Sequence, residues 1–121
     1  MINRVVLVGR LANDSVLRYS HDGLPISGFS LALPRNNDAP DYFPVVLFHR
    51  LAEATAKYLR KGRLVGIEGR LASRSIETSD GEKRRVIEVV ADRLRFLDPP
   101  IPLGEEDEAP EETAVPDPSG A

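Results

Sequence analysis

The chain has the length of one domain: 121 residues, of which 41% are hydrophobic and 29% charged, an ordinary globular composition. It contains no cysteine, which excludes disulfide frameworks, zinc sites built on thiolates and cysteine nucleophiles. No apolar run reaches the ~20 residues that a membrane span needs, and the first residues lack the pattern of a signal peptide. We therefore expect a soluble, cytoplasmic protein.

Charge divides the chain into two parts. Residues 1–98 hold all 16 Lys and Arg against 12 Asp and Glu, whereas residues 99–121 hold the other 7 acidic residues and no basic one. The second part also contains 6 of the 10 prolines and no aromatic residue. Such a segment cannot bury enough apolar surface to offset the entropy of ordering it. We predict a folded basic binding domain over 1–98 and a disordered acidic tail over 99–121, which on composition alone could serve solubility only.

The first half of the body alternates apolar and polar residues, or runs apolar and β-branched, as strands do. Pro44 indicates an edge position or a bulge, because proline cannot donate to a sheet ladder. The stretch Pro34–Pro40 is a loop by composition. The predicted strands are Val5–Gly9, extended after a turn by Val16–Tyr19, then Ile26–Leu33 and Tyr42–Phe48.

The period then changes from two to that of a helix. Leu51, Thr55 and Tyr58 fall on one helical stripe, which predicts a helix from Leu51 to Lys61 with cations in its last turn and Gly62 as its stop. Two long strands follow, Leu64–Ile76 and Arg84–Phe96, joined by a hairpin turn at 79–81.

Three strands, one helix and two strands exclude the parallel α/β folds, which need a helix between most strands. A sandwich would not place its one helix between the third and fourth strands. We predict an all-β fold, the five-stranded oligonucleotide/oligosaccharide-binding (OB) barrel with one helix between strands 3 and 4. Glycines at positions 9, 28, 66 and 69 suit the bends of such a small barrel.

The residues offer little for catalysis. His21 and His49 lie in unrelated contexts without the spacing of a metal site, and no glycine-rich loop joins a strand to a helix. We expect no enzymatic activity, no metal and no cofactor.

The sequence contains more residues suited to binding a nucleic acid than residues suited to catalysis. Binding single strands needs cations that follow phosphates and planar side chains on which bases stack. Arg outnumbers Lys by 13 to 3, and a guanidinium can both pair with phosphate and stack on a base. Alternation turns one of Leu47 and Phe48 outward, while Phe29 and Phe96 are expected in the core. These patterns leave the ligand of the barrel open.

Four blocks of sequence narrow the choice: 3–11, 17–19, 45–53 and 58–71. In this order they resemble bacterial single-stranded DNA-binding proteins, and the resemblance covers residues 2–98. It implies a homotetramer that binds and protects single-stranded DNA, independently of sequence, in replication, repair and recombination at the nucleoid. It also implies that Tyr42 and Phe48 stack on bases. With two strand arginines, Arg10 and Arg18, the candidate DNA-binding residues are Arg4, Arg10, Arg18, Tyr42, Phe48, Arg50, Arg60, Lys61 and Arg74.

The chain departs from the family pattern at three places. Ile76 stands where members commonly have a stacking aromatic, and Pro34–Pro40 lacks the aromatic and most of the cations often found there. The tail has the acidic stretch Glu105–Glu108 but no terminal aromatic residue of the kind that docks replication and repair proteins. Two alternatives remain: an OB subunit that mainly contacts proteins, as in a primosome, and an RNA-binding OB protein.

Overall fold

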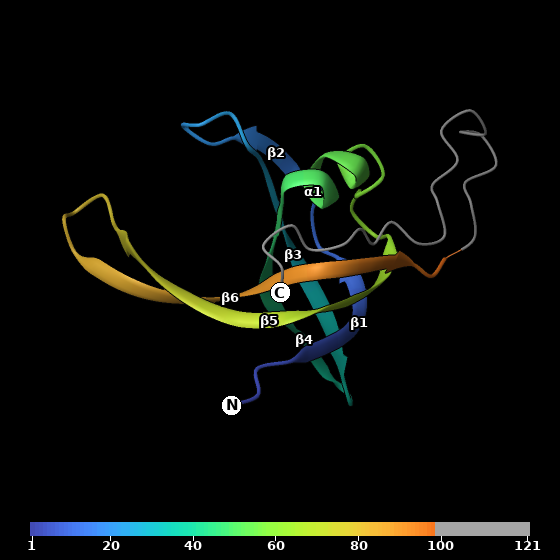
Figure 1. Cartoon of the computed structure of the whole chain (residues 1–121). Helices are drawn as coiled ribbons and strands as arrows, with labels where there is room; N and C mark the ends of the chain where they lie inside the picture. Colours follow the sequence, from blue (N-terminus) through green and yellow to red (C-terminus); the bar gives the residue numbers. More distant parts are fainter. Residues whose placement is uncertain (99–121) are drawn as a thin grey trace.

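The computed structural model describes residues 1–98, so the expectations for the acidic tail, 99–121, lie outside the described residues. Six strands and one helix make up this part of the chain (Figure 1). In chain order they are β1 (Val5–Leu11), β2 (Val16–Tyr19), β3 (Pro25–Arg35), β4 (Asp38–Phe48), α1 (His49–Thr55), β5 (Leu64–Glu77) and β6 (Lys83–Phe96).

The strands form a closed barrel. Their order in the sheet is β1-β5-β6-β4-β3-β2, and β1 also pairs with β3, which closes the ring. β1 and β2 are two halves of one interrupted strand, because Leu11 pairs with Leu31 and Val16 with Gly28 of the same partner, β3. The five-stranded OB barrel with its helix between the third and fourth barrel strands is therefore confirmed.

The pairing of β4 explains its proline. β4 is antiparallel to β3 along its length, but it pairs with β6 in parallel and only at Val45 and Val46. Pro44 pairs with Ser30 on the β3 side and lies just before the ladder to β6 begins. Its missing N–H therefore costs no ladder bond, as the predicted edge position requires.

The core lies inside the barrel and follows the predicted alternation. Phe29 and Leu31 of β3 point inward, as do Leu47 of β4 and Phe96 of β6, and each is at most 5% exposed. A bulge at Asp92 changes the inward parity along β6. Before it the buried apolar side chains are at odd positions and after it at even positions: Val89 and Ala91, then Leu94 and Phe96.

Two glycines allow strands to approach closely. A methyl group at Gly9 would overlap the carbonyl oxygen of Ala32, where β1 meets β3. A methyl group at Gly69 would overlap the carbonyl oxygen of Val90, beside the bulge in β6. Both positions therefore require glycine for packing rather than for a special backbone angle.

The predicted loop Pro34–Pro40 is wrong. β3 continues to Arg35 and β4 begins at Asp38, so that a two-residue turn, Asn36–Asn37, joins them. Asn37 has a φ of 60°, a left-handed conformation that asparagine tolerates well. Composition suggested a loop because Asn, Asp and Pro are turn residues, but here the prolines lie within strands.

The predicted extent of the helix is also wrong. α1 spans only seven residues and ends at Thr55, so the cations expected in its last turn lie beyond it. The Thr55 hydroxyl donates to the Leu51 carbonyl at 2.7 Å, and the Thr55 carbonyl accepts the Tyr58 N–H at 2.9 Å, a tighter three-residue closure. The turns that follow still bring Leu59 into the core, and Gly62 serves the last of them, with a φ of 91°.

β5 and β6 extend beyond the barrel as a two-stranded arm (Figure 1). They pair without interruption from Gly69 and Ala91 out to Glu77 and Lys83. The predicted turn at 79–81 closes this arm, with Gly81 at a φ of 85°.

Candidate nucleic-acid interface

Tyr42 and Phe48 lie on the same outer face of β4. Their side chains are 57% and 37% exposed, whereas Val45 and Leu47 between them point into the core. Because strand residues rise about 3.3 Å each, the two rings are anchored about 20 Å apart along the strand. We call the outer surface of β2, β3 and β4 around these rings the aromatic face. Alternation had predicted that one of Leu47 and Phe48 faces outward, and the structure shows that it is Phe48.

An arginine lies in line with each ring. Arg18 of β2 pairs with Ile26 of β3, which pairs with Phe48 of β4. Directly paired strand residues point to the same side of the sheet, so Arg18 and Phe48 share the aromatic face, two strands or about 10 Å apart. Both side chains are exposed.

Arg10 of β1 pairs with Ala32, which pairs with Tyr42 in the same manner. Its guanidinium donates from Nη1 to the Gly62 carbonyl at 2.9 Å, so the side chain leans toward the turn before β5. Each ring of the aromatic face therefore shares a cross-strand row with an arginine that lies two strands away in the sheet.

The face continues onto β6 and β5. Val46 of β4 pairs with Val90 of β6, which pairs with Arg70 of β5, so the exposed Arg70 belongs to the same outer surface. Arg70 was not among the candidate DNA-binding residues that the sequence analysis named. Only the order of the strands in the sheet reveals its place, since β4 and β5 are separated by the helix in sequence.

Arg74 stands on the outer side of the arm. Its Nε donates to the Glu88 carboxylate at 2.6 Å; the Glu88 side chain is 9% exposed and that of Arg74 57%. The bond uses Nε, which leaves the terminal amino groups suited to a phosphate. Ile76, which stands where family members commonly have a stacking aromatic, is half-buried on the same strand and pairs with Arg84.

Arg4 is placed differently from the other candidates. Its two terminal nitrogens meet Glu68 at 3.0 Å and Asp92 at 3.2 Å, so its charge is compensated by two carboxylates of β5 and β6. The outer surface there belongs to β1 and β5 rather than to the aromatic face. The sequence had no signal for this, because both carboxylates are more than sixty residues away.

The remaining candidate cations lie around the helix. Arg50 is exposed at the start of α1, directly after Phe48 and His49. Arg60 and Lys61 are exposed in the turns that follow the helix, where the Lys61 N–H donates to the Asp14 carboxylate at 2.8 Å. This bond brings Arg60 and Lys61 to the side of the barrel where β1 leads into β2. Arg50 lies at the end of the aromatic face because it comes two residues after Phe48, the last residue of β4.

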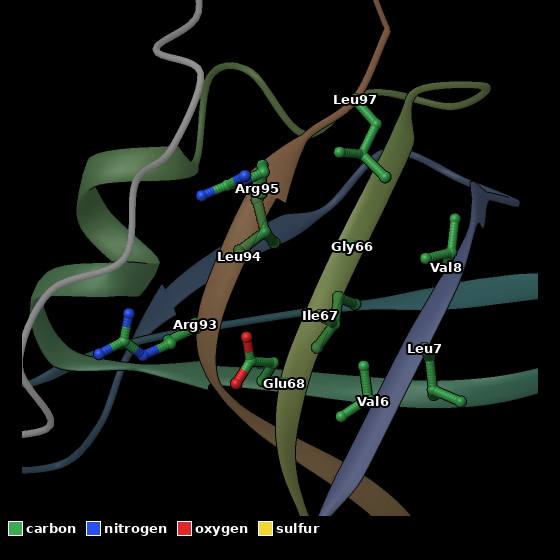
Figure 2. Close-up of a pocket in the computed structure, with 10 residues that line it drawn as sticks. All are labelled: Val6, Leu7, Val8, Gly66, Ile67, Glu68, Arg93, Leu94, Arg95 and Leu97. Atoms are coloured by element: carbon green, nitrogen blue, oxygen red, sulfur yellow. The ribbon is translucent and has the colours of Figure 1, made fainter.

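A second surface carries exposed apolar side chains. Figure 2 shows Val6 and Val8 on β1 beside Gly66 of β5, with Leu97 on the other side of that glycine. Val6, Val8 and Leu97 are 70%, 54% and 42% exposed. We call this the β1 face. No base-stacking ring lies in it; its polar lining consists of Glu68, Arg93 and Arg95.

Residues 1–98 contain neither a metal-binding cluster nor a membrane-spanning helix. No group of three or more His, Cys, Asp or Glu side chains there is arranged to hold a metal ion. Nor does this part of the chain contain a helix with the length and apolar character needed to cross a membrane.

Comparison with known proteins agrees with the nucleic-acid interface that the geometry indicates. The model of the single-strand binding protein family matches residues 2–97. A single-stranded DNA-binding protein of Caldanaerobacter subterraneus is 43% identical over 93% of this chain and 78% of its own length. Those of Clostridium tetani and Staphylococcus aureus strain MSSA476 are 45% and 40% identical over 80% and 82% of this chain, and over 71% and 67% of their own lengths. The chain belongs to the single-strand binding protein family.

Proposed function

We propose that this protein binds single-stranded DNA, without sequence preference and without catalysis, through the aromatic face. The observation that supports this most directly is the placement of Tyr42 and Phe48, exposed on one strand, with Arg10 and Arg18 on the same cross-strand rows. Its relatives are named for the same ligand. The biological setting we propose is the protection of strands exposed during replication, repair and recombination in the cytoplasm.

The chemistry of the face accounts for binding without sequence preference. Every base has a π-face, so bases can stack on Tyr42 and Phe48 whatever their identity. Arginines on the neighbouring strands can meet the phosphates that connect the stacked bases. An open face on a rigid barrel also suits a flexible single strand better than a stiff duplex, whose bases are already stacked.

The test is a titration with labelled oligo-dT. Phe48→Ala and Tyr42→Ala should each weaken binding by about 1–3 kcal/mol, the range for base–aromatic stacking. Phe48→Tyr and Tyr42→Phe keep a ring at each position and should bind like the parent. If both alanine variants remain folded and bind like the parent, the aromatic face is not the binding site.

The same titration at several salt concentrations tests the phosphate contacts. The slope of log K against log salt should become shallower by about 0.7 for each phosphate contact removed. We expect this for Arg18→Ala but a smaller change for Arg4→Ala, because Glu68 and Asp92 already compensate Arg4. An affinity independent of salt would favour the protein-contacting subunit, and equal affinity for oligo-U would favour an RNA-binding protein.

We further propose that the chain assembles with copies of itself through the β1 face. One edge of β1 pairs with β5 from Val5 to Arg10, but the other edge meets β3 only at Arg10 and Leu11. The Val5–Val8 edge is therefore open for another strand, beside the exposed Val6 and Val8. A second copy satisfies both the open backbone groups and the apolar surface.

Light scattering should give about four times the 13.3 kDa of one chain, the number that the family resemblance implies. Val6→Lys places a charge on the β1 face and should lower that mass. Ile87→Lys replaces an equally exposed apolar residue on the arm and should leave it unchanged. A parent that is monomeric at micromolar concentration would overturn the assembly proposal and leave the DNA-binding proposal standing.

A further inference from the structure

His49 has a backbone conformation that is uncommon for residues other than glycine. Its φ is 58°, and among residues 1–98 the only other non-glycine residue with a positive φ is Asn37. Asn37 occupies a two-residue hairpin turn, where asparagine is common. His49 instead stands where a strand passes directly into a helix: Phe48 before it is extended, with φ −124° and ψ 155°, and His49 is itself the first residue of α1.

The backbone at this junction does not call for a histidine. At this junction the residue that follows the extended Phe48 is left-handed, and glycine adopts that conformation without steric cost. An imidazole therefore stands here against the preference of the backbone. Strained residues of this kind gather at functional sites, which directs attention to what the side chain touches.

The imidazole lies beside the ring of Phe48. The two ring centroids are 6.0 Å apart and the ring planes are inclined by 43°. This separation is within the range of favourable aromatic pairs. Phe48 is exposed on the aromatic face, and His49 is only half-buried, so the pair presents two planar groups at the end of that face.

We propose that His49 is a further nucleotide-contacting residue, which extends the stacking surface of Phe48 to the next base along the strand. This inference rests on the proposed function. The tilt between the rings suits two successive bases that are not parallel to each other, as in a strand that bends around the end of the barrel. Arg50, exposed directly after His49, stands where the phosphate between such bases could be met.

The experiment compares variants that separate the ring from the backbone. His49→Asn and His49→Gly remove the imidazole but tolerate a left-handed conformation, so their Tm should equal or exceed that of the parent. Both should weaken oligo-dT binding about fivefold, the lower end of base–aromatic stacking. His49→Tyr restores a planar ring and should recover most of the affinity. His21→Asn removes the other histidine, exposed in the turn between β2 and β3, and should bind like the parent.

An abasic oligonucleotide of the same length distinguishes base contact from phosphate contact. His49→Asn should lose affinity for oligo-dT but not for the abasic strand. An equal loss on both strands, or unchanged oligo-dT binding in His49→Asn and His49→Gly, would overturn the proposal. If Phe48→Ala weakens binding while the His49 variants do not, the inference about His49 fails and the proposed function stands. If neither these variants nor Tyr42→Ala weakens it, the aromatic face is not the binding site and the proposal of that site fails as well.

Discussion

Asp98 follows β6 and binds the start of β5, and its replacement by asparagine tests how much this contact stabilises the barrel. Its two carboxylate oxygens accept bonds from Arg63 Nε at 3.1 and 3.0 Å, and one of them also accepts the Leu64 N–H at 3.3 Å. Arg63 is 7% exposed, donates from Nη1 to the Tyr58 carbonyl at 3.0 Å and lies 4.3 Å above the ring of Phe96. Asp98→Asn therefore leaves a buried guanidinium without its anion.

The magnitude follows from these contacts. A hydrogen bond to a charged group contributes about 1.5–3 kcal/mol, and the loss of a fully buried ionic partner costs more. The Asp98 side chain is 20% exposed, so water can replace part of what is lost. We expect Asp98→Asn to lower the free energy of unfolding by about 2 kcal/mol, which is a fall in Tm of roughly 8–16 °C for a domain of this size.

The effect should depend on pH. Burial alone would raise the pKa of the Asp98 carboxyl, but the bonds from Arg63 and from the Leu64 N–H, with the charge of Arg63, outweigh it and lower the pKa. A group with a lowered pKa in the folded state stabilises the fold above its unfolded pKa, ~3.9 for aspartate, and this stabilisation is lost as pH falls through the lowered value. The difference in stability between parent and Asp98→Asn should therefore shrink below about pH 4.

Thermal unfolding followed by circular dichroism from pH 7 to pH 3 measures both expectations. Asp80→Asn is the matched control, since the Thr78 hydroxyl also lowers the pKa of Asp80, but Asp80 is fully exposed on the arm. It should unfold close to the parent at every pH. An Asp98→Asn variant with the Tm of the parent at pH 7, or with a deficit that does not change down to pH 3, would refute the account of this ion pair.

Three further changes test other parts of the molecule. Gly69→Ala should destabilise the fold by about 1–3 kcal/mol, because its methyl group meets the Val90 carbonyl; an unchanged urea midpoint would contradict this. Arg74→Ala should make the salt slope of oligo-dT binding shallower by about 0.7, whereas an unchanged slope would mean that Arg74 serves Glu88 alone. A chain ending at Asp98 lacks the acidic tail, which can compete with phosphates. It should bind oligo-dT more tightly than the full chain at low salt and equally near ~1 M, where charges are screened; equal affinity at low salt would refute tail competition.

Much of the fold could be predicted because strand alternation is a local property. Successive side chains of a strand point to opposite sides, so the order of Leu47 and Phe48 alone places one of them inward and the other outward. The sequence of strand and helix periods likewise specified the barrel and the position of its helix. The helix end at Thr55 was missed because apolar residues that continue the predicted helical stripe, such as Tyr58, can be buried by tight turns as well as by a helix.

By itself, then, the sequence determined the barrel, the alternation of its strands and the supply of arginine, and its family resemblance proposed Tyr42 and Phe48 as the stacking rings. Only the tertiary structure decided which arginine shares a cross-strand row with which ring. Arg18 shares a cross-strand row with Phe48 because both pair with Ile26. Arg4 instead forms an ion pair with Glu68. The sequence alone did not distinguish these two arginines. The physical reason is that these neighbours are set by the pairing register of strands far apart in sequence, and a shift of one residue would turn each side chain to the opposite face.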